Sequence, residues 1–162
     1  MILAPGFLST ADAAGQPLPA GTVVTRIVVE KRARTMSVYR GWRLLKTYRI
    51  ALGPNPVGPK QREGDGRTPE GYYRIDYRNQ ESDFHLSLHI SYPGRSDIRR
   101  ARRQRASPGS DIMIHGQPND MDPSEKLRLS PDWTNGCIAV TDEEMDELWR
   151  VVPNGTRILI KP

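Results

Sequence analysis

Residues 84–92 have the sequence FHLSLHISY, in which apolar and polar side chains alternate almost perfectly. An alternation with a period of two places one set of side chains on each face of an extended strand. The apolar face carries Phe84, Leu86, Leu88, Ile90 and Tyr92, and the polar face carries His85, Ser87, His89 and Ser91. The stretch therefore predicts a half-buried β-strand.

Similar stretches occur along most of the chain. Runs of β-branched and apolar residues predict further strands at residues 23–30, 35–40, 42–51, 71–77, 111–115 and 157–160. Residues 53–66 contain three prolines and four glycines, which predict a long loop.

One segment has helical spacing. Residues 141–152 open with a capping box of Thr141 and Glu144, and acidic residues fill the first turn, where the helix dipole favours them. The buried stripe of this helix is predicted to consist of Met145, Leu148, Trp149 and Val152. With many strands and this one short helix, the predicted fold class is mostly β.

The length of 162 residues is typical of one domain with a hydrophobic core. Residues 1–20 contain several prolines and glycines and are expected to form an irregular lead-in, so the domain is assigned to residues 21–162. No apolar run is long enough to span a membrane. The first 20 residues lack Lys and Arg, so they do not match a complete secretory signal.

The net charge of +5 comes from a single segment. Residues 94–110 carry six arginines and one aspartate, whereas the rest of the chain is electrically balanced. Such a patch is compatible with nucleic-acid binding, with a solvated loop or short helix, or with an acidic substrate. No nucleic-acid-binding motif and no interleaved aromatic residues accompany it, so we expect no nucleic-acid partner.

Cys137 is the only cysteine, so no internal disulfide can form. Gly136, directly before it, allows a close backbone turn, and consecutive N–H groups at such a turn can stabilise an oxyanion. A thiol is mostly protonated at neutral pH and needs a base to act as a nucleophile. The alternative is that Cys137 is a small buried hydrophobic residue.

The candidates for that base are His85, His89 and His115, the only histidines in the chain. His115 ends an apolar strand and precedes Gly116, a position where side chains often face a site. His85 and His89 lie mid-strand, four residues and thus about 13 Å apart. They cannot share a metal ion, whose ligands each lie about 2 Å away. We favour His115 as the base and expect no metal and no cofactor.

Several motifs resemble those of the L,D-transpeptidase catalytic domain family. Residues 114–116 (IHG) and 134–138 (TNGCI) match its histidine and its Ser/Thr-His-Gly-Cys motif, with 18 residues between the two. Residues 27–29 (IVV) with 49–53 (RIALG) resemble its first hairpin, and residues 66–75 (GRTPEGYYRI) resemble its Thr-Pro-x-Gly segment. The resemblance covers residues 22–161 and identifies the domain as a catalytic domain of this type.

This resemblance implies a β-sandwich that binds peptidoglycan stem peptides. The family's nucleophile corresponds to Cys137 and its base to His115, with the ring oriented by the carbonyl of Gly116. The backbone N–H groups of Gly136 and Cys137, together with Asn135, would stabilise the oxyanion. The implied reaction attacks the carbonyl of the third stem residue, releases the terminal D-alanine and transfers the acyl group to an amine.

Other expectations concern partners and location. We expect substrate contacts from Thr134, His89, Tyr92 and Arg99. The resemblance implies carbapenem-type β-lactams as inhibitors, because they mimic the acyl centre of the donor. The substrate lies in the periplasm or elsewhere in the cell envelope, so we expect the protein there.

Two positions depart from the family pattern. Asn135 replaces the usual histidine before Gly-Cys, and Ala139 replaces the arginine two residues after the cysteine. Both positions shape the family's pockets, so transpeptidation, L,D-carboxypeptidase action and hydrolysis of a crosslink or an anchored protein all stay open. A catalytically silent peptidoglycan-binding module is the alternative of a different class. The intact Cys137 and His115 argue against it.

Overall fold

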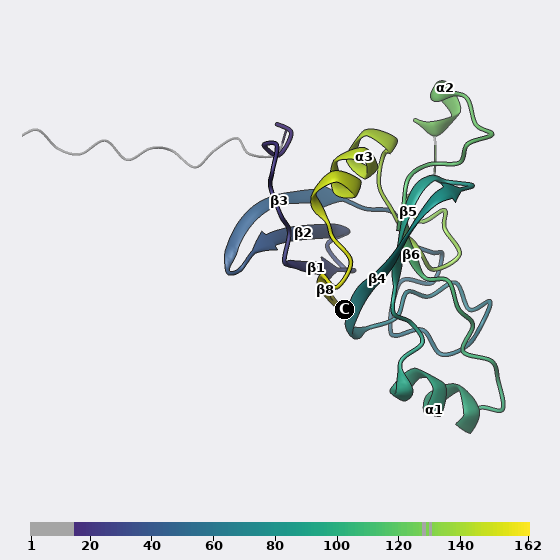
Figure 1. Ribbon diagram of the computed structural model, residues 1–162. Helices are drawn as coiled ribbons and strands as arrows, with labels where there is room; N and C mark the ends of the chain where they lie inside the picture. The colour runs from purple at the N-terminus through teal and green to yellow at the C-terminus, as the bar shows by residue number, and fades with distance from the viewer. Residues whose placement is uncertain (1–14, 128, 130) are drawn as a thin grey trace, which may run out of the picture.

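The computed structural model describes residues 15–127, 129 and 131–162, so the first 14 residues of the expected lead-in lie outside the described residues. Eight strands follow one another in a single hydrogen-bonded order, β3-β2-β1-β8-β4-β5-β6-β7 (Figure 1). Their bounds are β1 Arg26–Glu30, β2 Thr35–Arg40, β3 Arg43–Arg49, β4 Gly71–Ser82, β5 His85–Ile90, β6 Met113–His115, β7 Ile138–Ala139 and β8 Arg157–Lys161. The pairs β1–β8 and β6–β7 are parallel, and the other neighbours are antiparallel.

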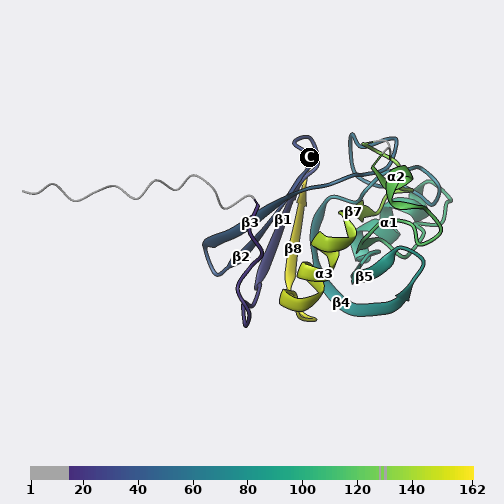
Figure 2. The ribbon, with the colours of Figure 1, turned by 90° about the horizontal axis from the view of Figure 1, so that it is seen from above.

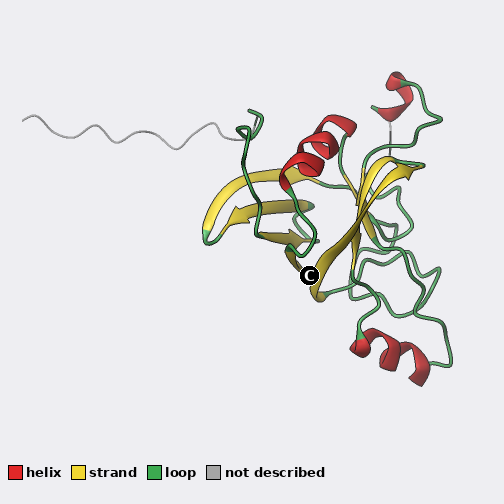
Figure 3. Cartoon of the chain, viewed as in Figure 1, coloured by secondary structure: helices red, strands yellow, loops and turns green. Residues whose placement is uncertain are grey.

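The long strand β4 takes part in two layers. The first layer is β3-β2-β1-β8 with the start of β4, and the second is the rest of β4 with β5, β6 and β7. The first residues of β4, Gly71 to Arg74, pair with β8, and its later residues pair with β5. A β-bridge between Ala51, just after β3, and Ala139 in β7 brings the two ends of the strand order together. The prediction of a mostly β sandwich is therefore confirmed, and Figure 3 shows that strands predominate over helices, with long loops between them.

Helix α3, Asp142–Val151, lies in the opening between the two layers (Figure 2). Thr141 caps it as predicted, because Thr141 Oγ1 accepts from the N–H of Glu144 at 3.2 Å. The expected stripe is buried except for Trp149, which is partly buried under the guanidinium of Arg78. One polar residue was not expected in this interface: Glu147 is buried and accepts from Tyr48 at 2.9 Å.

Two further helices occur in addition to the predicted one. Helix α1, Arg95–Arg103, forms in the arginine-rich segment, for which a loop and a short helix were both open. Helix α2, Pro123–Lys126, forms in a segment for which no helix was predicted, because Asp122 caps its first turn. These helices lie at opposite ends of the β4–β6 layer (Figure 1). No helix in the described part of the chain is long and apolar enough to cross a membrane.

Two strands differ from their predicted form. β4 continues to Ser82, five residues beyond the predicted end of that strand. In β5 the polar face is not simply solvated, because Ser87 is completely buried. The physical reason is that β5 has β4 on one side and β6 on the other, while α3 packs against it.

Candidate active site

Cys137 and His115 are positioned by two neighbouring strands of the second layer, β7 and β6. β6 runs parallel to β7, with Ile114 opposite Ile138 and His115 opposite Ala139. Cys137 directly precedes β7, and its thiol donates a hydrogen bond to the carbonyl oxygen of Asp111 at 3.4 Å. Sheet pairing therefore fixes the backbone positions of both residues.

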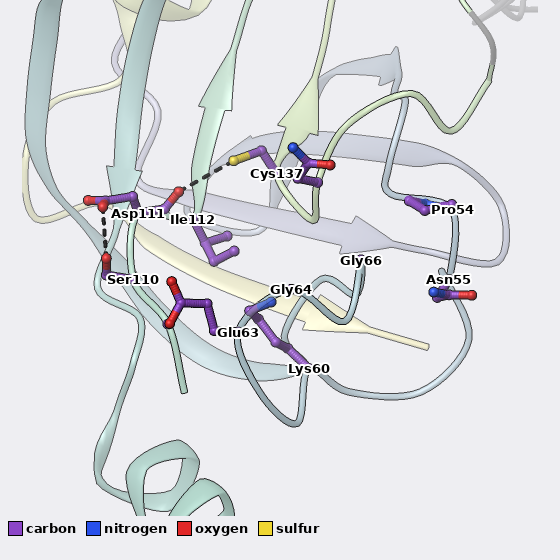
Figure 4. Close-up of a pocket in the computed structure, with 12 residues that line it drawn as sticks. Pro54, Asn55, Lys60, Glu63, Gly64, Gly66, Ser110, Asp111, Ile112 and Cys137 are labelled. Atoms are coloured by element: carbon purple, nitrogen blue, oxygen red, sulfur yellow. Dashed lines mark hydrogen bonds between the residues drawn. The ribbon is translucent and has the colours of Figure 1, made fainter. Parts of the chain in front are cut away.

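The thiol opens into a cavity of about 520 Å³ (Figure 4). The cavity lies between the cysteine turn, the loop at residues 53–66 and the segment that leads into β6. It is lined by Pro54, Asn55, Lys60, Glu63, Gly64, Gly66, Gly109, Ser110, Asp111, Ile112, Asn135 and Cys137. A partly exposed cysteine in such a cavity can be reached by a small molecule, so it does not behave as core filler.

His115 is buried and held in one orientation. Its Nδ1 lies 2.7 Å from the carbonyl oxygen of Gly116, which requires the proton on Nδ1 in the neutral ring. The ring packs against Phe84, with centroids 4.6 Å apart, and against Trp133, with centroids 5.6 Å apart. The lone pair of the neutral ring is therefore on Nε2.

Burial keeps both groups uncharged at rest. It lowers the pKa of His115 below its ordinary value, and the hydrogen bond with the carbonyl of Gly116 only partly offsets this. Burial also raises the pKa of the Cys137 thiol, although a backbone hydrogen bond from Met113 and the ammonium of Lys60 act in the opposite direction. Among the described residues no hydrogen bond joins the thiol to the His115 ring: the thiol donates to the carbonyl of Asp111, and His115 Nδ1 is bonded to the carbonyl of Gly116.

The turn before Cys137 requires glycine. Gly136 has φ +120°, and a Cβ there would lie 2.5 Å from the carbonyl oxygen of Arg67. Thr134 is buried, and its hydroxyl donates to the carbonyl of Cys137 at 2.8 Å and accepts from the N–H of Gly136 at 3.2 Å. Thr134 therefore shapes the turn from inside, although it was expected to contact substrate.

The expected oxyanion donors differ in availability. The N–H of Gly136 is already bonded to Thr134. The N–H groups of Asn135 and Cys137 have no acceptor within the part of the chain that the structure describes. Both residues line the cavity, so these two N–H groups are the donors that a substrate oxygen could use.

The other predicted substrate contacts lie at different places. His89 borders the site through Asp111, since its Nε2 lies 4.0 Å from the Asp111 carboxylate while its Nδ1 bonds Asp76 at 2.6 Å. Tyr92 is in the core, where its hydroxyl donates to the carbonyl of Pro108 at 2.6 Å. Arg99 is exposed on α1 and does not line the cavity.

One wall of the cavity was not predicted from the sequence. Lys60, Glu63 and Asp111 are its charged lining residues, and residues 53–66 were predicted only to be a loop. The run from Lys60 to Asp65 has a charged residue at most positions, which was the available signal. Within the described residues no group of three His, Cys, Asp or Glu side chains is placed to hold a metal ion.

Comparisons with known proteins agree with this fold. The family model of the L,D-transpeptidase catalytic domain, YkuD, matches residues 24–160. YafK of Escherichia coli K12 has L,D-transpeptidase in its name. It is 30% identical over 142 residues, which cover 85% of this chain and 50% of YafK. The chain thus spans about half the length of this relative. YkuD of Bacillus licheniformis is 28% identical, over 87% of this chain and 68% of that protein.

Solved structures show the same fold. The helical cell shape determining protein Pgp2 of Campylobacter jejuni has a TM-score of 0.66 at 22% identity, over 92% of this chain and 52% of Pgp2. The L,D-transpeptidase of Xylanimonas cellulosilytica has a TM-score of 0.56 at 15% identity, over 90% of this chain and 64% of that one. From the family match across nearly all of the described domain, we conclude that the chain belongs to the L,D-transpeptidase catalytic domain family.

Proposed function

We propose that this domain is a peptidoglycan-modifying cysteine acyltransferase, with Cys137 as nucleophile and His115 as its general base. The observation that carries the proposal is a partly exposed thiol in a cavity, just before a strand that pairs with the strand of His115, whose buried imidazole has its Nδ1 fixed by the carbonyl of Gly116 at 2.7 Å. A carbonyl oxygen holds the histidine tautomer and thus takes the part of the third group in a catalytic triad.

The proposed reaction has two steps. His115 Nε2 takes the thiol proton as Sγ attacks the carbonyl carbon of the third stem residue, and the thiol gives up its hydrogen bond to Asp111. The N–H groups of Cys137 and Asn135 stabilise the tetrahedral oxyanion. The imidazolium then protonates the leaving amine of D-alanine, which leaves a thioester on Cys137. An amine acceptor then attacks the thioester carbonyl while His115 Nε2 takes its proton. The C–S bond breaks as the new amide forms, and the imidazolium returns the proton to the Cys137 thiolate.

The acceptor is the open part of the proposal. Ala139 borders a separate hollow of about 250 Å³ with Trp133 and Glu144, and it brings no charge to it. Arg49 and Lys126 line the same hollow, so a cationic contact for an acceptor would come from these residues and not from position 139. The arginine typical of the family is missing at position 139 itself, so hydrolytic use of the same thioester is the second candidate. Because peptidoglycan lies in the cell envelope, we place the reaction there.

Intact-mass spectrometry tests the nucleophile and the acceptor together. Purified protein is mixed with a carbapenem, with a tetrapeptide muropeptide alone, and with the tetrapeptide plus an amine acceptor. We expect a drug-sized adduct on the native protein and none on Cys137→Ala, which should keep its fold because a cavity thiol contributes little packing. Circular dichroism and a melting curve check the fold of that variant.

The peptide products separate the candidate activities. Tripeptide from the tetrapeptide alone indicates carboxypeptidase action, and a new crosslink with the acceptor indicates transpeptidation. Turnover confined to crosslinked or protein-anchored substrates indicates a hydrolase of those bonds. A folded protein that gives neither adduct nor turnover would contradict the enzyme assignment and favour a peptidoglycan-binding module.

A further inference from the structure

The outer face of the first layer carries a row of arginines. Side chains alternate along each strand, and Ile27 and Ile158 belong to the core, so their neighbours Arg26 and Arg157 point away from it. In the register of the sheet Arg157 of β8 lies between Arg26 of β1 and Arg74 of β4. Adjacent strands are about 4.8 Å apart, so three arginine side chains leave the same face side by side.

No carboxylate of the described residues pairs with this arginine row. None of the three arginines forms an ion pair within that part of the chain, and Arg74 bonds only a backbone carbonyl, at 3.1 Å. Two acidic residues of the same strands have other partners: Glu30 lies 3.9 Å from Lys161, and Asp76 lies 2.6 Å from His89. Like charges directly opposite each other destabilise a sheet, so the row costs stability that a bound anion would recover.

Aromatic rings flank the arginine row. The guanidinium of Arg26 lies 4.4 Å from the ring centroid of Tyr39 and 4.9 Å from that of Trp42. Its Nε is buried without a hydrogen-bond partner in the described part of the chain, so ring contacts hold this guanidinium. Trp42 is 89% exposed, and Tyr72, two residues before the arginine of β4, is 84% exposed. The row therefore has open aromatic surface at both of its ends.

This combination fits a chain of sugar rings that carries carboxylates. A guanidinium binds a carboxylate through two parallel hydrogen bonds, and the C–H face of a sugar ring packs on an exposed aromatic ring. The outer arginines of the row are two strand spacings apart, roughly 10 Å, which is comparable to the length of a disaccharide. A membrane-binding face has an apolar centre with cations around it, whereas the centre of this face is cationic. The order of charge and ring therefore favours a glycan over a lipid surface.

We infer that the arginine row and its two exposed rings form a docking surface for an anionic glycan strand. The surface consists of Arg26, Arg74, Arg157, Trp42 and Tyr72. None of these residues lines the cavity at Cys137, so glycan and stem peptide are held at different places. The choice of glycan rests on the proposed function, because peptidoglycan consists of glycan strands with attached peptides.

Peptide-free glycan strands test this surface apart from the cavity. Strands prepared from peptidoglycan with an amidase contain no stem peptide and keep a lactyl carboxylate on every second sugar. Calorimetry at physiological salt compares them with neutral N-acetylglucosamine oligosaccharides of the same length. We expect the native protein to bind the charged strands about tenfold more tightly, because several exposed charge pairs each contribute a small part.

A triple variant tests the arginine row. Replacing its three arginines with Gln should remove the preference for the charged strands. The matched control removes the same charge from helix α1, which lies away from β1, β2 and β3 (Figure 1). That control should leave the affinity within about twofold of the native value, because its charges are distant and screened. The control replaces Arg99, Arg102 and Arg103 with Gln.

Two single variants test the parts of the surface with little risk to the fold. Arg157→Gln removes an exposed side chain from the middle of the row, and its melting temperature should not fall, because repulsion is relieved. It should still weaken binding of the charged strands. Trp42→Ala should weaken both glycans about 2- to 10-fold, the range for one stacked ring.

Three outcomes would overturn the inference. The triple variant binds the charged strands as tightly as the native protein, the native protein shows no preference for them, or it binds vesicles of anionic lipid and no glycan. The last outcome would assign the face to a membrane. Failure of the proposed function is a separate result, in which the protein binds peptide-free glycan normally and forms neither thioester nor product with stem peptides.

Discussion

The two walls of the cavity are built in different ways. The strand wall, formed by β6, β7 and the turn between Thr134 and Cys137, is held by sheet pairing, and burial keeps its two reactive groups uncharged. The loop wall, residues 53–66, contains no strand or helix and is held by buried charges. The proposed nucleophile and base are therefore positioned by paired strands, whereas the charged residues Lys60 and Glu63 lie on the loop.

Removing the base on the strand wall should have the largest effect. We expect His115→Ala to lower kcat for thioester formation by about 10²–10⁴, the usual contribution of a general base. Single-turnover kinetics with a carbapenem or a tetrapeptide measure this step. The matched control is His85→Ala, since His85 is a partly buried histidine whose Nε2 bonds Asp146 on α3 and not the site. A loss below tenfold in His115→Ala would contradict the role of the strand wall.

The pH profile checks the same group by another route. Burial places the pKa of His115 below its ordinary value of 6.5, and only the neutral ring can accept the thiol proton. The acylation rate should therefore rise with pH through a midpoint below 6.5 and already be near its plateau at pH 7. The pKa of the thiol is raised from 9.0, so free thiolate does not explain activity at neutral pH. A midpoint near or above 9 would instead indicate direct ionisation of Cys137.

Removing a buried charge that anchors the loop wall should lower the stability of the protein. Lys31→Met leaves the carboxylate of Glu70 and two backbone carbonyls without their buried partner, and we expect a loss of about 3 kcal/mol in the free energy of unfolding. Urea denaturation measures it. The control Lys161→Met removes an exposed lysine that is 3.9 Å from Glu30, and it should change stability by less than about 0.5 kcal/mol. Equal effects of the two variants would show that the buried lysine does not anchor the loop.

The smallest effect should come from α1, which lies beyond the loop wall. Asp97 and Ala101 face inward, and Arg100 pairs with Asp97 at 3.0 Å, so the solvated arginines of this helix are Arg95, Arg99, Arg102 and Arg103. Replacing these four with Gln should lower kcat/KM for an anionic peptide about threefold at low ionic strength and leave it unchanged in high salt, because screening removes long-range attraction. Equal values at both salt concentrations would show that the patch does not take part in substrate capture.

The sequence predicted the elements whose signal is local. The capping box and apolar stripe located α3, and strict alternation located β5. Cys137 and His115 could be proposed as the reactive pair because the chain has one cysteine and a histidine at a strand end before glycine. These features depend on neighbours within a few residues, so the linear sequence contains them.

Features that depend on distant partners were not predictable. Helix α1 is stabilised by Asp97, whose carboxylate accepts from Tyr73 in β4. Tyr92 was expected to contact substrate, but its hydroxyl donates to the carbonyl of Pro108 and its ring is buried in the core. Lys60 resembled an ordinary solvated lysine, and only the fold of residues 53–66 around Asp65 buries it. In each case the deciding contact joins segments that the sequence alone does not bring together.

The position of β8 has a consequence for how the domain assembles. This strand follows every other strand in the sequence, yet it lies between β1 and β4 and pairs with both. The hydroxyl of Thr156 reaches the carbonyl of Val24 across a separation of 132 residues. Closing such a large loop is entropically costly, and folding slows as contacts become more distant in sequence. The first layer therefore cannot close until the segment after α3 has been made, and until then β1 and β4 each expose an unpaired edge that other chains could bind.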